Sequence, residues 1–337
     1  MQKKNPAKRR PERLVVTLLS LLFLSTAVFA TVKYVFRAPE LDTDKPVVTP
    51  DGTASADADR TDTDEPDALG RTRRKYCYNI LVSGLDDDNG GSDTNILVRF
   101  DVPNKRIDLV SLPRDTLLHN EYRNNKLNFA YAKGGTELLM EQIENLLGIP
   151  VDFYVTVNLK GFIALVDQID GVDFDIPINM DYDDPYQDLH IHFTKGPRHL
   201  NGQEAMEVVR FRHNNDGTGY GTEDIGRIGT QQAFLKAVAK QLLQIGNVKN
   251  IPALVDIFYT YVKTDLTTGN LVWLGNEALN IGTENIHFAT LPGDGSGYYN
   301  KQSVYVLDAQ ATCDLVNETL NPYNEALTLE DMDILVP

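Results

Sequence analysis

A long apolar segment near the N-terminus constrains this chain more than any other feature. It runs from Leu14 to Phe36 and is interrupted by small hydroxyl residues and by Lys33 near its end. About 20 apolar residues suffice to cross the hydrocarbon core of a bilayer. Residues 1–13 hold six basic residues and one acidic residue, a pattern that keeps an N-terminal tail in the cytoplasm. We therefore expect a cytoplasmic tail at 1–13, a transmembrane anchor at 14–36 and the rest of the chain outside the cell.

Cleavage of this segment is the alternative to a retained anchor. Val28-Phe29-Ala30 resembles a signal-peptide cleavage site, and cleavage there would make the protein a secreted one. The apolar core of a signal peptide has only about 7–15 residues, so the length of the run favours the anchor.

The segment after the anchor differs in composition from everything that follows it. Residues 38–70 contain ten acidic and two basic residues, four prolines and no aromatic residue. Such a segment cannot bury enough apolar surface to offset the entropy lost on ordering. We expect an extracellular disordered linker at 37–75 and one extracellular domain at 76–337.

Charge and cysteine content exclude several classes of protein. The whole chain has a formal net charge of −16, and from residue 71 onward 37 acidic residues face 22 basic ones. General nucleic-acid binding needs a basic face, so we expect no nucleic-acid partner. Two cysteines exclude a disulfide-dense scaffold and a four-cysteine zinc site. Whether Cys77 and Cys313 form a disulfide or two buried thiols is left open by the sequence.

Short β-branched runs alternate with helical periodicity along the domain. This alternation predicts an α/β fold with a mixed central sheet flanked by helices. The strands at 94–100 and 106–112 are separated by a Val-Pro-Asn-Lys turn and are expected to pair as a hairpin. The other expected strands are 78–82, 151–157, 172–176 and 285–291. The expected helices are 136–147, 159–169, 203–212, 222–245, 251–262, 270–281 and 306–320.

An acidic loop follows the first strand of the domain. Four carboxylates lie between Gly84 and Thr94, and Asp86 comes directly after the strand. Carboxylates this close repel one another unless a cation lies among them. Oxygen ligands without His or Cys favour Mg²⁺ or Ca²⁺ over zinc. A solvated acidic turn is the alternative.

Basic side chains recur at the ends of predicted elements. Arg114 and Asp115 follow the third strand, and a guanidinium is a fixed fork suited to phosphate oxygens. Each motif taken alone is equally compatible with a surface ion pair or a solvated helix face. The candidate residues are Arg114, Asp115, Lys126, Arg210, Arg212, Asp224, Arg227 and Gln231, of which Asp224, Arg227 and Gln231 share one face of a helix.

The sequence resembles the LytR-CpsA-Psr family of cell-envelope proteins over about residues 76–250. The motifs that carry the resemblance, in order, are Gly84-x-Asp86, Ser92-Asp93-Thr94, Leu112-Pro113-Arg114-Asp115, Lys126-Leu127-Asn128, Gly171-Val172, Leu200-Asn201-Gly202, Arg210-x-Arg212 and Asp224-x-x-Arg227 with Gln231. Gly91 and Leu118 stand where the family often has arginine.

The resemblance implies a phosphotransferase that moves a glycopolymer, such as wall teichoic acid or capsular polysaccharide, from a polyprenyl (pyro)phosphate carrier to a peptidoglycan sugar hydroxyl. It implies a single-pass protein of a Gram-positive-type cell membrane. By the same resemblance Asp86 and Asp93 would hold Mg²⁺, the four arginines would grip the phosphates with help from Lys126 and Gln231, and Asp224 would orient an arginine. Either Asp93 or Asp115 would accept the hydroxyl proton.

Two other functions are compatible with the same residues. A non-catalytic sensor or scaffold of envelope assembly would bind polyprenyl phosphate through the same arginines without turnover. A transcriptional regulator is disfavoured, because the expected topology places an acidic domain outside the cell.

Overall fold

A computed structural model describes residues 36–41, 47–48, 54–55, 66–67, 69–85, 91–120, 122, 124–186, 188–220, 223–244 and 257–336. Nearly all of the expected anchor at 14–36 lies outside these residues, as does most of the acidic loop with Asp86. Within the described part of the chain, no helix is both long enough and apolar enough to cross a bilayer.

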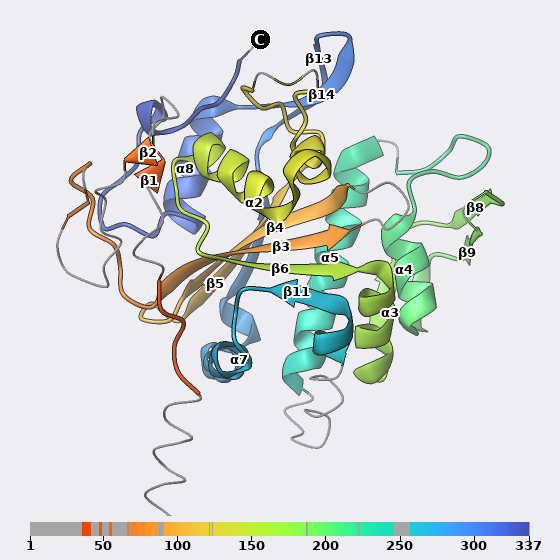
Figure 1. Cartoon of the computed structure of the whole chain (residues 1–337). Helices are drawn as coiled ribbons and strands as arrows, with labels where there is room; N and C mark the ends of the chain where they lie inside the picture. Colours follow the sequence, from red (N-terminus) through yellow and green to blue (C-terminus); the bar gives the residue numbers. More distant parts are fainter. Residues whose placement is uncertain are drawn as a thin grey trace, which may run out of the picture.

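A six-stranded mixed sheet forms the centre of the domain, as the alternating pattern predicted (Figure 1). Three consecutive strands pair antiparallel in its middle, and one strand on each side of them joins in parallel. The expected hairpin of the second and third strands is confirmed. In spatial order the strands are β11 (Val262–Thr264), β6 (Phe153–Asn158), β3 (Cys77–Leu85), β4 (Ser92–Asp101), β5 (Arg106–Leu112) and β12 (Ile286–Thr290).

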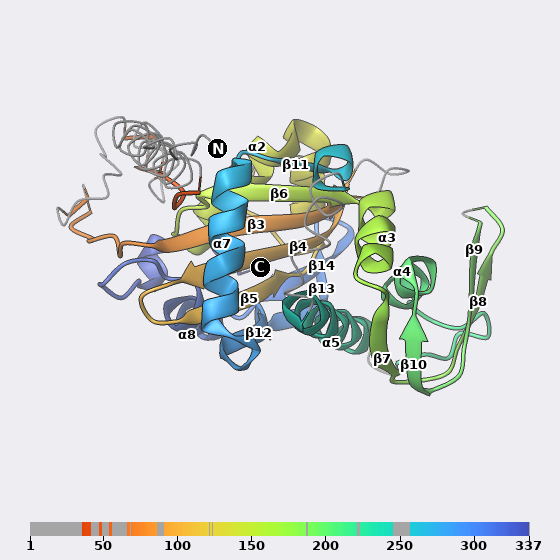
Figure 2. The ribbon, with the colours of Figure 1, turned by 90° about the horizontal axis from the view of Figure 1, so that it is seen from below.

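Helices cover both faces of this sheet because alternate strand residues are apolar on each side. On one face α2 (Leu127–Leu147) and α8 (Ala309–Thr319) pack on Leu81 and Leu97 (Figure 1). On the other face α7 (Thr268–Ile281) packs on Ile80 and crosses the strands (Figure 2). The α2 helix ends at Gly148, whose left-handed φ of 65° suits the glycine that the sequence places there.

A second lobe with its own core lies beside the carboxyl ends of β3 and β6 (Figure 2). It is built from two antiparallel strand pairs and three helices. Its elements are α3 (Leu159–Gln168), β7 (Val172–Ile176), β8 (Met180–Asp184), β9 (Leu189–Phe193), β10 (Gly196–Leu200), α4 (Gly202–Arg210) and α5 (Glu223–Gln244). The remaining elements are β1 (Val47–Val48), β2 (Ala54–Ser55), β13 (Gly293–Tyr299), β14 (Gln302–Leu307) and the short 3₁₀ helices Thr283–Asn285 and Leu329–Asp331.

Several expected helices have different ends in the structure. The helix expected at 136–147 begins already at Leu127, with a kink at Gly134 and Gly135 just before the expected start. The helix expected at 251–262 ends before Val262, which begins β11. The helix expected from Val306 begins only at Ala309, because the carboxylate of Asp308 caps the backbone N–H of Ala311. The α4 helix ends at Arg210, so Arg212 lies beyond it.

Parts of the expected linker at 37–75 belong to the domain. The hydroxyl of Tyr78 donates to the carbonyl of Pro39 at 3.0 Å, and the amide of Asn270 donates to the carbonyl of Arg37 at 3.1 Å. Arg73 forms an ion pair with the buried Asp152. The folded unit therefore includes residues on the N-terminal side of the expected boundary at Tyr76.

Both cysteines are free, buried thiols. Cys77 begins β3, whereas Cys313 lies in α8 within the core between that helix and the sheet. Of the two possibilities that the sequence left open, the structure therefore has the two separate thiols and not the disulfide.

Removal of the Asp108 carboxylate should destabilise the sheet. Arg99 Nη2 lies 2.7 Å from Asp108 Oδ2, and both side chains are less than 5% exposed. Asp108→Ala would leave a buried guanidinium without its counter-ion, so we expect a loss of about 3–5 kcal/mol in the free energy of unfolding. Urea unfolding followed by Trp273 fluorescence measures it. Glu40→Ala is the control, because Glu40 forms an exposed ion pair with Arg37, whose side chain is 48% exposed and that of Glu40 72%. This variant should change the free energy of unfolding by less than about 1 kcal/mol. An equal loss in both variants would contradict the argument.

Cys77 should be unreactive in the native protein. Its burial should also make the stability of the protein depend on pH in the alkaline range. Burial raises the pKa of this thiol from 9.0 to about 11. The unfolded chain therefore ionises first, and the free energy of unfolding should fall as the pH rises from about 9 to 11. To isolate the effect of Cys77 from that of other groups, the free energy of unfolding is measured against pH for two proteins, the single variant Cys313→Ser and the double variant Cys77→Ser/Cys313→Ser. The difference between the two curves is the contribution of Cys77. A thiol reagent at pH 8 should label Cys77 slowly unless urea is added, and rapid native labelling would refute the prediction.

Candidate functional site

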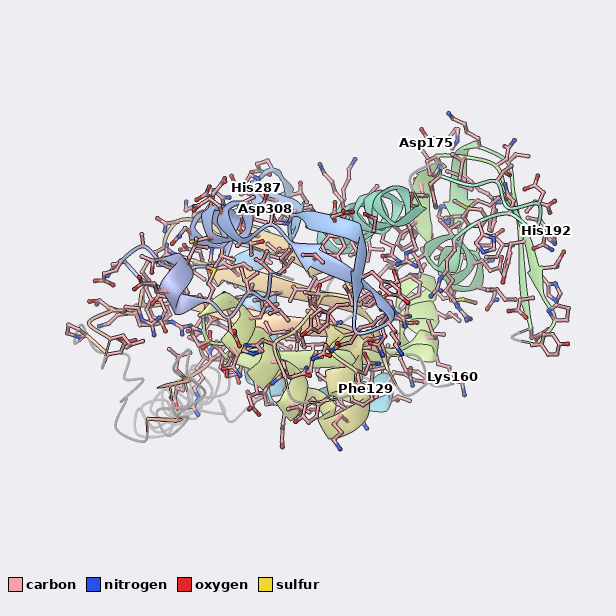
Figure 3. The ribbon with its side chains drawn as sticks, turned by 90° about the horizontal axis from the view of Figure 1, so that it is seen from above. Phe129, Lys160, Asp175, His192, His287 and Asp308 are labelled. Atoms are coloured by element: carbon pink, nitrogen blue, oxygen red, sulfur yellow. The ribbon has the colours of Figure 1, made fainter. Side chains whose placement is uncertain are left out.

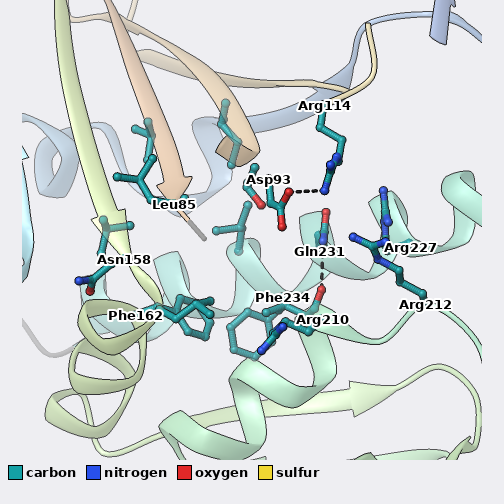
Figure 4. Close-up of a pocket in the computed structure, with 18 of the residues that line it drawn as sticks. Leu85, Asp93, Arg114, Asn158, Phe162, Arg210, Arg212, Arg227, Gln231 and Phe234 are labelled. Carbon is teal, nitrogen blue, oxygen red and sulfur yellow. Dashed lines mark hydrogen bonds and ion pairs between the residues drawn. The ribbon is translucent and has the colours of Figure 1, made fainter. Parts of the chain in front are cut away.

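A pocket of about 640 Å³ lies where the sheet meets the second lobe (Figure 4). The strands β3 and β6 end at it with Leu85 and Asn158, and β4 begins at it with Asp93. Carboxyl ends of strands are where α/β proteins place their binding sites. Helices α4 and α5 supply the opposite wall through Arg210 and Arg227.

The segment after β5 holds Arg114 at the pocket. The carbonyl of Arg114 accepts a 2.9 Å hydrogen bond from the N–H of Asn128 in the first turn of α2. Tyr305 of β14 pairs with the neighbouring residues, with its N–H 2.8 Å from the carbonyl of Asp115. The guanidinium of Arg114 then reaches across to form an ion pair with the carboxylate of Asp93. A strand end, a helix start and a second hairpin therefore fix one arginine.

Asp115 and Lys126 lie next to this pair and are not part of the pocket lining. Asp115 Oδ1 is 3.3 Å from the Lys126 ammonium and 3.7 Å from Arg114 Nε. Lys126 is the residue immediately before α2, so the start of that helix sets its position. Of the two carboxylates that the sequence offered as proton acceptors, Asp93 is the one that lines the pocket.

Arg210 and Arg212 reach the pocket because the chain becomes extended between them. Arg210 is the last residue of α4, and Phe211 has φ −59° and ψ 132°. The Phe211 side chain is fully buried in the core of the second lobe, while both arginines line the pocket. On an extended segment, residues i and i+2 point to the same side and residue i+1 points to the opposite side. Because Phe211 points into the core, Arg210 and Arg212 point toward the pocket.

Helix α5 presents Arg227 and Gln231 to the pocket, as their shared helix face predicted. The amide of Gln231 donates to the carbonyl of Val209 at 3.0 Å, which ties α5 to the end of α4. The next residue, Gln232, donates to Ala289 and Thr290 at the end of β12. Asp224 belongs to the first turn of α5, and its side chain is outside the described structure.

Residues 213–220, in the Gly-rich segment between Arg212 and α5, form a turn. His213 and Gly219 make an antiparallel bridge, and Tyr220 stacks edge-on against Phe211 with ring centroids 5.7 Å apart. Gly226 of α5 permits this packing, because a Cβ there would lie 2.3 Å from Tyr220 Cβ.

The other half of the pocket is apolar. Phe162 and Phe234 lie there with their ring centroids 5.8 Å apart (Figure 4). Leu139 and Ile143 of α2 do not line this pocket and are buried in the core between that helix and the sheet. The other apolar lining residues include Leu85, Ile96, Val157, Leu159, Leu189 and Leu235.

Several lining residues were missed from the sequence. Asn158 ends β6, and the rule that sites lie at strand ends would have found it. His213 adjoins Arg212 and therefore stood within a motif already recognised. Tyr182 belongs to the β8–β9 hairpin, which was not predicted, and only the assembled fold brings it to the pocket.

The pocket therefore presents four guanidinium groups and one described carboxylate beside an apolar wall. Such a donor set suits an anionic headgroup attached to an apolar tail. Mg²⁺ is often held by only one or two protein carboxylates together with substrate phosphates, so Asp93 fits a site of this kind. A metal site made by protein ligands alone would need more donors than the described lining offers.

A family model supports the motif-based identification. The model of the LytR_cpsA_psr family matches residues 47–321. The chain belongs to this family. It is 31% identical over 264 residues to the polyisoprenyl-teichoic acid–peptidoglycan teichoic acid transferase TagV of Bacillus subtilis, which covers 74% of this chain and 65% of TagV. The chain thus aligns with slightly less than two thirds of that relative's length.

Other members of the LytR_cpsA_psr family carry different names. The transferase TagU of Bacillus cereus is 32% identical over 71% of this chain and 76% of its own length. The regulatory protein MsrR of Staphylococcus aureus is 31% identical over 63% of this chain and 64% of its own. The crystal structure of B. subtilis TagV superposes with a TM-score of 0.62 at 27% identity, covering 78% of this chain and all of that one. The mixed sheet and flanking helices are therefore the architecture of this family.

Truncation of Phe234 should destabilise the second lobe and widen the pocket. Its side chain is fully buried and packs against Phe174 with ring centroids 5.4 Å apart. Phe→Ala changes at such sites cost about 3–5 kcal/mol, so we expect a loss of that size in the free energy of unfolding. Phe162→Ala, a half-buried ring lining the same pocket, should cost less. Urea unfolding of both variants tests this ranking, and a larger loss for Phe162→Ala would contradict it.

Proposed function

We propose that this protein transfers a glycopolymer from a polyprenyl (pyro)phosphate carrier to a sugar hydroxyl of peptidoglycan. The observation that carries the proposal is the pairing, in one pocket, of four arginines with an apolar wall. A polyprenyl pyrophosphate has this same division, with an anionic headgroup and a hydrocarbon tail. The names of TagV and TagU as teichoic acid transferases support the same class of reaction.

The arginines would bind the phosphates and stabilise the charge that develops on them. Guanidinium groups donate paired hydrogen bonds to phosphate oxygens and stay charged at all relevant pH values. Arg114, Arg210, Arg212 and Arg227 come from three separate parts of the fold, so they can surround a headgroup. Phosphoryl transfer depends mainly on positioning and charge stabilisation and needs no protein nucleophile.

The reaction that these residues support is a displacement at phosphorus. The acceptor hydroxyl oxygen forms a bond to the phosphorus nearest the polymer. The bond from that phosphorus to the bridging oxygen breaks, and the bridging oxygen leaves with polyprenyl phosphate. Asp93 accepts the hydroxyl proton, since it is the described carboxylate that lines the pocket. Asp115 positions Arg114 and Lys126 from behind.

Mg²⁺ is the cofactor we propose, held by Asp86 and Asp93 next to the substrate phosphates. When bound, the ion would neutralise phosphate charge and favour departure of the carrier phosphate. The carboxylate of Asp93 already forms an ion pair with the guanidinium of Arg114, so its negative charge is compensated with or without the metal.

We also propose that the protein is a single-pass protein of a Gram-positive-type cell membrane. The basic tail at 1–13 and the apolar run at 14–36 support a cytoplasmic N-terminus, with residues 76–337 as the extracellular catalytic domain. The partners would be the carrier-linked glycopolymer, the bilayer and peptidoglycan, and no nucleic acid.

Purified full-length protein in detergent should transfer glycan from a polyprenyl-pyrophosphate donor to peptidoglycan when Mg²⁺ is present. Asp93→Ala and Arg227→Ala should each lower kcat/KM by at least about 100-fold, the usual effect of losing one group that stabilises charge in the transition state. Arg198→Ala is the matched control, because Arg198 lies in the same lobe outside the pocket and pairs with Glu204 at 2.7 Å. It should leave kcat/KM unchanged.

Other results would overturn the proposal. Tight binding of the lipid without turnover, unaffected by Asp93→Ala, would indicate the non-catalytic sensor or scaffold. If the purified protein instead retarded DNA in a gel, the result would support the function of a transcriptional regulator.

A further inference from the structure

The β8–β9 hairpin separates apolar from titratable side chains by strand alternation. Met180 of β8 and Leu189, Ile191 and Phe193 of β9 are buried in the core of the second lobe. The alternate positions hold aspartate on one strand and histidine on the other, and all four side chains are exposed. The cross-strand partners on that outer face are Asp181 with His192 and Asp183 with His190. Figure 3 shows His192 at the outer edge of the molecule.

Both imidazoles converge on one carboxylate. Asp183 Oδ1 lies 2.5 Å from Nδ1 of His190 and 3.4 Å from Nε2 of His192. The other nitrogen of each ring faces a second carboxylate: Nδ1 of His192 is 2.8 Å from Asp181, and Nε2 of His190 is 3.7 Å from Asp188. A carboxylate behind a histidine fixes the ring and raises its basicity, which is the usual support of a metal-binding histidine.

An ordinary ion pair elsewhere on the same lobe provides a comparison. His199 of β10 lies opposite Asp173 of β7, with Nδ1 2.8 Å from a carboxylate oxygen. That pair has one imidazole and one carboxylate, as expected of a surface pair. Among the described residues, the group of Asp183, His190 and His192 is the one in which three possible ligand atoms all lie within 4.8 Å of one another.

We propose that His190, His192 and Asp183 bind a divalent transition-metal ion such as Zn²⁺ on the outer face of the hairpin, with Asp181 orienting His192. Two nitrogens and one oxygen suit Zn²⁺ and its neighbours in the first transition series, and they do not suit Mg²⁺. Ligand atoms around a tetrahedral zinc at about 2.1 Å lie about 3.4 Å apart. The pair of Asp183 Oδ1 and His192 Nε2 already has this spacing at 3.4 Å, whereas the 2.5 Å pair of Asp183 Oδ1 and His190 Nδ1 must open by about 1 Å. Exposed side chains on a hairpin can make that adjustment by small χ rotations.

Occupation of this site would brace one wall of the main pocket. Tyr182 and Leu189 of the same hairpin line that pocket. Asn214 and Asn215, which follow Arg212 and His213, accept hydrogen bonds from the backbone N–H groups of Asp181 and Asp183 at 2.7 and 3.1 Å. The proposed ion is separate from the Mg²⁺ assigned to Asp86 and Asp93, and the proposal does not depend on the transfer reaction.

Calorimetric titration of Zn²⁺ into the full-length, chelator-stripped protein tests the proposal. We expect one zinc ion per chain at this site. His190→Ala, His192→Ala and Asp183→Ala should each weaken binding at least about tenfold, and Asp181→Asn about tenfold as the loss of a supporting carboxylate. His199→Ala is the matched control and should bind zinc like the unaltered protein. Asp93→Ala should also leave zinc binding unchanged, which separates this site from the pocket.

Substitution by Co²⁺ supplies a second readout. The visible ligand-field absorption of protein-bound cobalt should appear in the unaltered protein and in His199→Ala, and it should be lost in His192→Ala. Circular dichroism would establish that each variant is folded, and the exposure of these side chains makes unfolding unexpected. Absence of zinc binding, binding that survives loss of both His190 and His192, or equal weakening in His199→Ala would overturn the proposal.

Discussion

The docking of α5 between the sheet and the second lobe determines the shape of the pocket. Burial of Phe234 holds the helix to the lobe, where its ring packs against Phe162 of α3 and Phe174 of β7. Gln232 holds it to the sheet through the carbonyl of Ala289. A side chain that loses its partners in such an interface costs several kcal/mol, so the helix has one favoured position. Arg227 occupies its place in the pocket because of that position.

Strand direction accounts for the other wall. Because β3 and β6 run parallel and β4 turns back beside β3, Leu85, Asn158 and Asp93 meet at one edge. Arg114 joins them because β5 is antiparallel to β4 and ends at the same edge. These directions follow from a hairpin signal and a helical crossover, which the sequence expresses locally. For this reason the mixed sheet was predictable from local patterns, whereas a common site for Asp93 and Arg114 was expected from the family resemblance.

Elements whose residues lack strong strand preference were not predictable in the same way. The β8–β9 hairpin alternates Asp and His with apolar residues, and Asp is a poor strand former, so only the period of two marks it. Val306 was assigned to a helix because an apolar stretch of few residues fits either period, whereas the cap at Asp308 marks the true start. The apolar wall formed by Phe162 and Phe234 depends on contacts between segments far apart in the chain. Local periodicity does not encode such contacts.

The tie between the N-terminal segment and the sheet bears on how a membrane-bound carrier could reach the pocket. Residues 37–41 are held at the start of β3 through Tyr78, whereas the pocket lies at its end beyond Leu85. A nine-residue strand spans about 26 Å, close to the thickness of a hydrocarbon core. If residues 14–36 cross the bilayer, the start of β3 lies close to the membrane surface. The headgroup of a membrane-bound carrier can then reach the pocket at the other end of β3 only when the strands lie parallel to that surface. Helix α7, next to residue 37, exposes the apolar side chains of Val272 and Leu279 at 38% and 50%, and its one charged residue is Glu277.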